Sequence, residues 1–569
     1  MENDHRHMTW WKKAIGYIIY PSAFKDVNND GIGDLQGIIS KLDYLHDLGV
    51  DLLWICPFFK SPMDDNGYDV SNYVQIDPRF GTNEDFDLLI KEAHVRGIRI
   101  VIDFVLNHTS DEHPWFIEAR HNPNSPKRDY YLMLPPRYQG EKRLPPTNWK
   151  GFFSTSTWSY DEASSLYYMH IFSKKMPDVN WSNPALREQY HQIAKYYLDK
   201  GVDGFRLDAL AHLARDMSFK DSTLNRDENG LAFDIGKYSN RPELFDYMRE
   251  FKEEVFSKYD CVTIGEVGGG ISPEQSLNLS GYERGSISMV FNFDTAWGNG
   301  AYDSVAKKDE DLATDVKNLK RNFNRWHSIC DGKAWMPLYW TNHDHPRALS
   351  QYGSVKYRTE SAEMLITTLL FMYGTPFIYC GDEIGMSNVD YTNIEDFNDV
   401  SARNYLAENQ HKYDMDTLLR FLRRTSRVNA RTPMQWSDEA HAGFSSVAPC
   451  QKVNGNYRDV NVKKQENDPD SILSYYKKAI QLRRQQGILE TVLFGAFSFV
   501  DIEDDDVVSY LHKGEKNLLL VSNFRCKTVE YSLNYPINEI LLHNYCDEIM
   551  GEKNITLRPF ECYLFAFKD

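Results

Sequence analysis

Short apolar runs recur along the first two thirds of the chain, and polar segments with helical spacing lie between them. The runs are continuous rather than alternating, which is typical of parallel strands buried on both faces. Eight such strands alternating with helices predict an α/β fold, a (β/α)8 TIM barrel with its active site at the C-terminal ends of the strands. The predicted strands are Gly16–Tyr20, Val50–Cys56, Ile98–Val105, Gly204–Ala209, Cys261–Val267, Ser286–Phe293, Met336–Thr341 and Thr375–Cys380.

The segments between the runs carry helix signals. After the first run, apolar residues recur at three- and four-residue spacing up to Gly49, which predicts a helix that this glycine ends. After the second run, Thr82 and Asp85 resemble a capping box at the start of another helix. The apolar positions of the first helix are Ile38, Ile39, Leu42, Leu45 and Leu48.

Two insertions and a tail interrupt this rhythm. Residues 109–181 are rich in Pro, Tyr, Asn and Ser and too long for a simple connection, so they predict an inserted subdomain over the barrel mouth. Residues 385–444 form a polar, partly helical insertion. Alternating apolar runs within residues 487–569 predict a C-terminal antiparallel β-sandwich domain. Residues 1–108 and 182–486 are left for the barrel.

Composition narrows the choice of partners and compartment. The 569-residue chain has a formal charge of −18 without a long acidic tail, which argues against a nucleic-acid or anionic-membrane partner. Met1–His5 shows no basic segment before an apolar run, so we expect a soluble, cytoplasmic protein, monomeric or weakly oligomeric. The eight cysteines form no CxxC pair or Cys/His cluster, which favours buried thiols over disulfides or a metal site.

Four of the strand-like runs end in polar residues. Their sequences are Asp103–His108, Gly204–Asp208, Thr263–Val267 and Thr341–Arg347. Together they resemble the four sequence regions of the α-amylase family of glycoside hydrolases. The likeness covers nearly the whole chain and is closest to the oligo-1,6-glucosidase and α-glucosidase branch.

This resemblance implies cleavage of an acetal between sugars. A retaining enzyme needs a nucleophilic carboxylate and a protonated carboxyl about 5 Å from it. The family motifs assign these roles to Asp208 and Glu266, and assign Asp344 as a third carboxylate that grips sugar hydroxyls. Arg206 lies two residues before Asp208, so it points to the same side of the strand and is expected to hold the nucleophile ionised. Desolvation and neighbouring carboxylates would keep Glu266 protonated.

Further matches to the family describe a glucose pocket. His108 and His343 match two histidines that donate to glucose hydroxyls. In Asp65–Asp69, Asp65 matches the residue that binds a terminal glucose, and Tyr68 matches the ring that stacks under it. An arginine in Ser426–Trp436 is implied to pair with that aspartate and make the enzyme exo-acting; Arg431 is our choice over Arg427.

The segment Asp26–Asp34 places oxygen ligands at alternate positions around a glycine turn, like the start of a calcium loop. The resemblance implies a structural Ca²⁺ or Mg²⁺ there and no cofactor for catalysis. The alternative is a turn rich in Asp and Asn. The implied ligands are Asp26, Asn28, Asp30, the Ile32 carbonyl and Asp34.

Linkage preference is suggested by the residue after the nucleophile. In this branch valine goes with α-1,6 preference and alanine or threonine with α-1,4 preference, so Ala209 favours α-1,4 or mixed activity. The difference is worth only about 1–3 kcal/mol. Departures from the branch pattern at Met176, Val428 and His345 also bear on linkage rather than on reaction type.

Two other functions stay open. A transglycosylase such as a sucrose isomerase or trehalose synthase shares the three carboxylates and differs in excluding water from the glucosyl-enzyme. The isomerases' Arg-Leu-Asp-Arg-Asp signature is missing, since Asn324–Cys330 occupies its region. A non-catalytic relative would lack the carboxylates and carry a membrane anchor, and the sequence shows neither feature.

Overall fold

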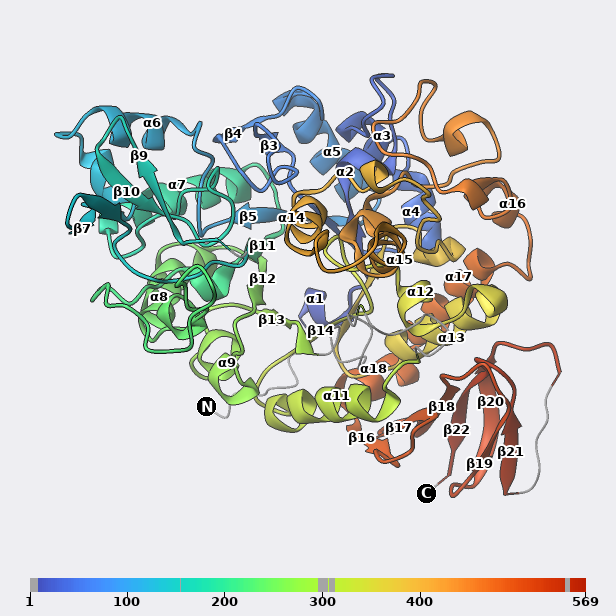
Figure 1. Ribbon diagram of the computed structural model, residues 1–569. Coiled ribbons are helices and arrows are strands. Elements are labelled where there is room, and N and C mark those ends of the chain that lie inside the picture. Colours follow the sequence, from blue (N-terminus) through green and yellow to red (C-terminus); the bar gives the residue numbers. More distant parts are fainter. Residues whose placement is uncertain (1–8, 154, 295–304, 306–312, 548–552, 569) are drawn as a thin grey trace. The chain divides into compact units, whose positions relative to one another are not determined.

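A computed structural model describes residues 9–153, 155–294, 305, 313–547 and 553–568 (Figure 1). Met1–His5, on which the expectation about targeting was based, lies outside these residues. No helix in the described ranges is long and apolar enough to span a membrane.

All eight predicted barrel strands are present. They form one eight-stranded sheet in the order β13-β12-β11-β5-β2-β1-β15-β14, which is the chain order read around a ring. The recorded pairings within it are parallel. This confirms the (β/α)8 barrel. The strands are β1 (Gly16–Ile19), β2 (Leu52–Ile55), β5 (Arg99–Val105), β11 (Gly204–Asp208), β12 (Val262–Val267), β13 (Met289–Asn292), β14 (Pro337–Tyr339) and β15 (Thr375–Tyr379).

Two predicted helix signals also appear. The segment before Gly49 forms two short helices instead of one, and Gly49 ends the second with a left-handed φ of 96°. The Thr82 Oγ1 accepts from the Asp85 N–H, and Asp85 accepts from the Thr82 N–H at 2.8 Å, which confirms the capping box. The helices are α1 (Trp10–Lys13), α2 (Pro21–Phe24), α3 (Leu35–Ile39), α4 (Leu42–Leu48), α5 (Asn83–Val95), α7 (Pro184–Asp199), α8 (Glu243–Glu254), α9 (Pro273–Ser280), α11 (Val316–Cys330), α12 (Ala348–Tyr352), α13 (Arg358–Leu370), α16 (Val462–Gln465), α17 (Ile472–Arg483) and α18 (Gln486–Phe494).

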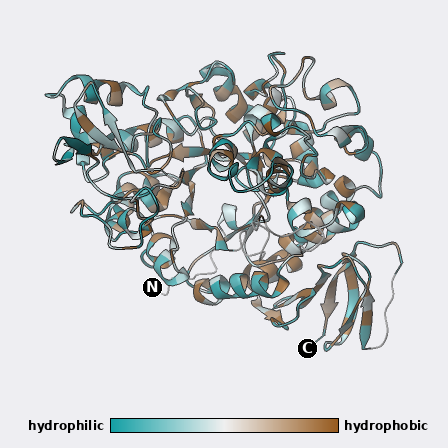
Figure 2. Ribbon diagram, viewed as in Figure 1, coloured by the Kyte–Doolittle hydropathy of each residue, from teal (hydrophilic) through white to brown (hydrophobic). Residues whose placement is uncertain are grey.

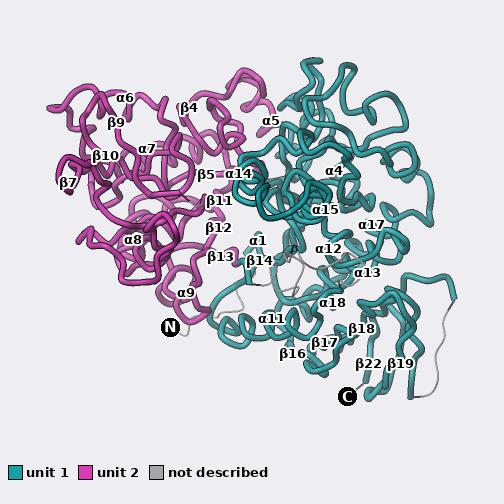
Figure 3. The backbone as a smooth tube through the Cα atoms, viewed as in Figure 1, with its two compact units in different colours: residues 1–54, 91–99, 293–569 teal, residues 55–90, 100–292 magenta. Residues whose placement is uncertain are grey.

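The chain divides into two compact units (Figure 3). Unit 1 contains residues 1–54, 91–99 and 293–569, and unit 2 contains residues 55–90 and 100–292. Both units include barrel strands. The units therefore divide the barrel, whereas the domains expected from the sequence keep it whole. The expected domain boundaries stay a prediction.

Within unit 2, the segment after β5 has structure of its own. It begins with α6 (Pro114–His121) and continues into a three-stranded sheet and a hairpin. Buried Trp149, Trp158 and Met169 belong to its apolar cluster. The sheet consists of β6 (Met133–Leu134), β9 (Trp158–Asp161) and β10 (Leu166–Met169), the hairpin of β7 (Arg137–Gln139) and β8 (Lys142–Leu144), and β3 (Phe59–Lys60) and β4 (Asn72–Ile76) form a further pair.

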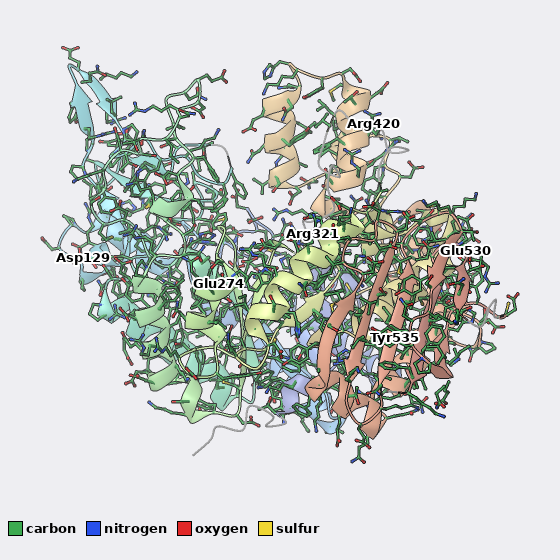
Figure 4. The ribbon with its side chains drawn as sticks, turned by 90° about the horizontal axis from the view of Figure 1, so that it is seen from below. Asp129, Glu274, Arg321, Arg420, Glu530 and Tyr535 are labelled. Carbon is green, nitrogen blue, oxygen red and sulfur yellow. The ribbon has the colours of Figure 1, made fainter. Side chains whose placement is uncertain are left out.

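Within unit 1, the insertion after β15 includes the helices α14 (Val400–Asn409) and α15 (Met415–Thr425). Figure 4 labels Arg420 on α15. Phe397, Ala402 and Leu422 pack in one buried cluster, so this partly polar insertion has a small apolar core.

The end of the chain folds as the predicted antiparallel β domain. A five-stranded and a two-stranded sheet share one apolar cluster, to which Leu519 and Phe565 of the first and Tyr531 and Ile555 of the second belong. The sheets consist of β16 (Ala496–Val500), β17 (Val507–Lys513), β18 (Leu518–Asn523), β22 (Cys562–Phe567) and β20 (Ile537–His543), and of β19 (Val529–Ser532) and β21 (Asn554–Leu557).

Helix α11, which lies between β13 and β14 in the chain, contacts this β domain. Its buried residues recur at three- and four-residue spacing, and Figure 2 shows hydrophilic residues beside them along the helix. The buried Lys320 Nζ donates to the Asp501 and Val507 carbonyls at 2.7 and 2.8 Å. Arg321, labelled in Figure 4, pairs with Glu503 at 2.5 Å.

No disulfide joins any of the eight cysteines. Cys56, Cys330, Cys380 and Cys562 are buried, as predicted. The prediction is wrong for the three exposed thiols, which lie in loops rather than in apolar strands; they are Cys450, Cys526 and Cys546.

Candidate active site

Three carboxylates of unit 2 converge on Arg206 near the C-terminal ends of β5, β11 and β12. They belong to Asp103, Asp208 and Glu266. In the parallel register Arg206 stands opposite Asp103 on β5 and Ile264 on β12. Because side chains alternate along a strand, Arg206 and Asp208 point to the same side. The register thus gives a buried guanidinium access to carboxylates from three neighbouring strands.

Arg206 contacts all three of these carboxylates. Its Nη1 is 2.7 Å from Asp103 Oδ1 and also binds Asp208 Oδ1, while its Nη2 is 2.7 Å from Glu266 Oε1. The second Glu266 oxygen accepts from the Ala209 N–H at 2.8 Å. Asp208 and Glu266 are therefore held together by two nitrogens of one guanidinium.

The buried carboxylates of Asp103 and Asp208 and the partly buried carboxylate of Glu266 share the Arg206 cation. Burial raises the pKa of Asp208 well above its ordinary value, and the charges of Glu266 and Asp103 raise it further. Arg206 lowers the pKa of Asp208, as predicted, but burial outweighs it. Glu266 also binds this cation, so Asp208 and Glu266 interact through one guanidinium.

Tyr68 is attached to the same group. It is buried, and its hydroxyl donates to Asp103 Oδ2 at 3.1 Å. The loop before it is organised by Asp69, a residue to which we gave no role: Asp69 accepts from the Asp65 N–H at 3.2 Å and the Ser61 hydroxyl at 2.9 Å. Burial raises the pKa of Asp69 to about 6.

His108 is held in one tautomer by a buried polar network that we did not predict. Arg215 donates to Asn107 Oδ1 at 2.6 Å, which turns the Asn107 amide nitrogen toward His108 Nδ1 at 3.1 Å and Asp178 at 3.0 Å. Nδ1 therefore accepts, and the ring proton lies on Nε2. Nε2 has no hydrogen-bond partner among the described residues. Burial lowers the pKa of His108 to about 4, so the ring is a neutral donor.

A second charged group lies in unit 1 after β14. Asp344 is contacted by Arg427 Nη1 at 3.1 Å, Arg431 Nη2 at 3.0 Å and His343 Nε2 at 3.1 Å. Asp399 pairs with both arginines, at 2.9 and 3.3 Å. Arg427 lowers the pKa of Asp399 to about 2 despite burial. Two arginines thus bridge two aspartates.

Sequence reasoning missed Asp399 because it looks like an ordinary helix cap. Its side chain does accept from the Ser401 N–H at the start of α14. The arginine pairing predicted for Asp65 is a separate contact and stays a prediction. His343 is buried and stacks on Tyr20, with ring centroids 6.0 Å apart. Burial lowers the pKa of His345 to about 4.

The predicted site residues therefore lie in two groups. Unit 2 brings Asp208 and Glu266 together. Asp344 belongs to unit 1, so the three carboxylates are not all gathered within one unit. The other predicted residues divide between Asp65, Tyr68, His108, Arg206 and Ala209 in unit 2 and His343, Arg427 and Arg431 in unit 1.

The predicted metal loop is built as a series of turns. Asp26 Oδ1 accepts from the Asn29 N–H at 2.7 Å, and Asp34 Oδ2 accepts from the Asn28 N–H at 3.0 Å. Asp30 Oδ1 accepts from the Ile32 N–H at 2.8 Å. Oxygen ligands suit Ca²⁺ or Mg²⁺, but no group of three acidic, His or Cys side chains in the described ranges could hold a metal ion. The structural cation in this loop therefore stays a prediction.

This chain is similar to several known enzymes. The oligo-1,6-glucosidase of Parageobacillus thermoglucosidasius is 42% identical over 98% of this chain and 99% of its own length. The α-glucosidase of Schizosaccharomyces pombe is 37% identical over 98% of this chain and 97% of its own. Among solved structures, an isomaltulose synthase from Klebsiella superposes with a TM-score of 0.91 at 36% identity, covering 99% of this chain and 100% of that one.

A trehalose-6-phosphate hydrolase from Bacillus licheniformis superposes equally well, with a TM-score of 0.91 at 35% identity and coverage of 99% and 100%. Residues 18–491 match the α-amylase catalytic domain. This match spans most of the chain and contains both charged groups described above. The protein therefore belongs to the α-amylase family of glycoside hydrolases.

Proposed function

We propose that this protein is a retaining, exo-acting α-glucosidase that hydrolyses terminal α-linked glucose from short oligosaccharides. The observation that carries the proposal is the Arg206 guanidinium, which holds Asp208 and Glu266 through its two terminal nitrogens. Carboxyls bound to one guanidinium are close enough for the separation of about 5 Å that a retaining enzyme uses.

In the first step, Asp208 attacks the anomeric carbon of the terminal glucose as a carboxylate. Glu266 gives its proton to the glycosidic oxygen while that bond breaks, so the shortened sugar leaves neutral and glucose is bound to Asp208 as an ester. In the second step, Glu266 takes a proton from water, whose oxygen attacks the anomeric carbon and releases Asp208. The two carboxyl groups, the sugar and water supply all the protons and electron pairs of these steps, so no cofactor takes part.

The remaining roles follow from the family motifs. His108 is a neutral donor with Nε2 available, which supports its proposed contact with a glucose hydroxyl. We assign Asp344 as the third carboxylate, His343 as a hydroxyl donor, and Asp65 and Tyr68 as contacts of the terminal glucose. Arg427 or Arg431 would close the pocket behind that one sugar.

Two opposing indications bear on the linkage preference. The relatives from Parageobacillus thermoglucosidasius and Bacillus cereus are named for the 1,6 linkage. Ala209 favours α-1,4 or mixed activity. We propose a mixed α-1,4 and α-1,6 range, with sucrose as a further substrate.

Product analysis after separate incubation with maltose, isomaltose, sucrose and trehalose tests the proposal. Glucose released from maltose or isomaltose in the α-anomeric form supports a retaining glucosidase. New disaccharides without net hydrolysis would indicate a transglycosylase, a function favoured by the structural similarity to isomaltulose synthase. Asp208→Ala and Glu266→Gln should each lower turnover by orders of magnitude, and full activity in either would overturn the assignment.

A structural cation in the loop that contains Asp26 is supported only by its oxygen-rich sequence. Measuring the melting temperature in the presence of Ca²⁺ and of a chelator tests it. A bound ion stabilises the folded state, so the melting temperature should rise as the Ca²⁺ concentration rises. A cytoplasmic location, the absence of nucleic-acid and membrane partners, and a monomeric or weakly oligomeric state likewise stay predictions.

A further inference from the structure

Unit 2 contains a pocket that is lined by none of the three carboxylates bound to Arg206. It has a volume of about 340 Å³, within the range of about 300–1,000 Å³ that is typical of small-molecule sites. Strand β4, the start of α6 and helix α7 form its walls, and Figure 1 shows α6, α7 and β4 in the same part of unit 2. The side chains used below are those of His113, Trp115, Gln189, Gln192 and Tyr196.

His113 supplies a buried donor to this pocket. It is 5% exposed, and its Nδ1 accepts from the Trp115 N–H at 3.1 Å as the cap of α6. The ring proton is therefore on Nε2, which makes no hydrogen bond to any described residue. Burial lowers the pKa of His113 to about 3, so the ring is neutral.

Trp115 and Tyr196 supply aromatic surface. The Trp115 ring is fixed by His113 at a centroid distance of 4.4 Å and by edge contacts with Tyr130 at 5.5 Å and Tyr190 at 6.0 Å. It is still half-buried rather than covered. Tyr196 is 36% exposed. A rigid, partly exposed indole beside a second ring can stack on an apolar face of a ligand at little entropic cost.

Helix α7 adds amide groups. Gln189 is half-buried, and its side chain makes no hydrogen bond within the described residues. Gln192 donates to Glu188 and keeps its carbonyl oxygen as an acceptor.

No Asp, Glu, Lys or Arg side chain among the described residues lines the pocket itself. Lys127 Nζ lies 5.4 Å from the centroid of the Trp115 ring, and Lys200 Nζ, which pairs with Asp87, lies 5.3 Å from that of Tyr196. The lining side chains offer both donors and acceptors to a neutral ligand with hydroxyl groups.

We propose that this pocket is a second carbohydrate-binding site, which takes one terminal glucose unit of a short oligosaccharide. The apolar face of the sugar stacks on Trp115, and its hydroxyls bond His113 Nε2 and the Gln189 amide. The identity of the sugar rests on the proposed function, since that function supplies glucose-terminated oligosaccharides. The pocket would hold substrate or product on the surface without taking part in bond cleavage.

The test is ¹⁹F NMR of the full chain labelled with 5-fluorotryptophan, in the Glu266→Gln background so that maltotriose is not consumed. The chain has 12 Trp, and Trp115→Phe assigns the resonance of interest by its loss. We expect this resonance to shift and saturate with maltotriose. Gln189→Ala should weaken that binding at least threefold, whereas Tyr138→Ala, which removes a ring that is 67% exposed on β7, should not change it.

A Trp115 resonance that stays in place up to 50 mM maltotriose would overturn the proposal. So would equal affinities in Gln189→Ala and its parent. Turnover of a chromogenic α-glucoside by Gln189→Ala in the otherwise wild-type chain should equal that of the wild type, which shows that the variant is folded. Failure of the proposed function is distinguishable, because the wild-type protein would then release no glucose whatever the Trp115 resonance does.

Discussion

Replacing Asp103 by asparagine should move the acid limb of activity to lower pH. Asp208 must be ionised to attack, and the neighbouring charge of Asp103 raises its pKa. Both carboxylates bind Nη1 of Arg206, so we take their separation as about 5 Å, the sum of two hydrogen-bond lengths. At an effective dielectric constant of about 20, two unit charges at this distance repel by about 3 kcal/mol, which corresponds to about 2 pKa units. Without the Asp103 charge the pKa of Asp208 falls by that amount.

The assay is the pH dependence of kcat/KM for p-nitrophenyl α-glucoside, whose leaving group needs little proton donation. In Asp103→Asn the acid limb should shift down by about 2 pH units. Glu254→Gln is the matched control, because Glu254 pairs with Lys258 on an exposed helix surface and should leave the profile unchanged. An acid limb in Asp103→Asn that stays within about 0.3 units of the wild type, against the expected shift of about 2 units, would refute the coupling of the two carboxylates.

Four further outcomes are expected. Arg206→Met leaves two buried carboxylates and the partly buried Glu266 without their cation and should lower stability by about 3–5 kcal/mol, as measured by urea unfolding. Arg249→Met, which removes an exposed pair with Asp246, should cost less than about 1 kcal/mol. Asp399→Asn should lower the free energy of unfolding by about 2 kcal/mol at pH 7, because the pKa of Asp399 falls from 3.8 to about 2 on folding. This contribution is present above pH 3.8 and is lost as the pH falls through 2. The stabilities of the variant and the wild type should therefore converge at that pH. His108→Ala should raise KM for maltose up to about tenfold through loss of one donor, and an unchanged KM would remove this residue from the pocket. Ala209→Val should change the ratio of isomaltose to maltose hydrolysis about tenfold in favour of isomaltose, and a constant ratio would show that this side chain does not set linkage.

The barrel could be predicted because its strands carry their own signal. A parallel strand buried on both faces needs a continuous apolar run, and β2 and β15 are buried at every position. The two compact units were not predictable in this way. They depend on how closely segments far apart in sequence pack, as with residues 91–99, which belong to unit 1 while the rest of α5 belongs to unit 2. Periodicity contains no such information.

The site shows the same contrast. Asp208 and Glu266 follow apolar runs, so both position and residue type identify them. Asp399 and Arg215 lie in segments without such a pattern, and their partners are distant in sequence: Arg427 is 28 residues from Asp399, and Asn107 is 108 residues from Arg215. A lone polar residue in a loop is indistinguishable from a solvated one until the fold provides its partner.

The contact between the Ala209 N–H and Glu266 has an evolutionary consequence. The donor is the backbone of the residue whose side chain is expected to choose between linkages. Substitution at position 209 can therefore vary the sugar that is accepted without deleting this hydrogen bond, and only proline would abolish it. The left-handed φ of 49° at Ala209 limits the choice, since bulky residues are strained there. Substrate range can thus diverge among descendants of one catalyst while the bond-breaking apparatus is inherited intact.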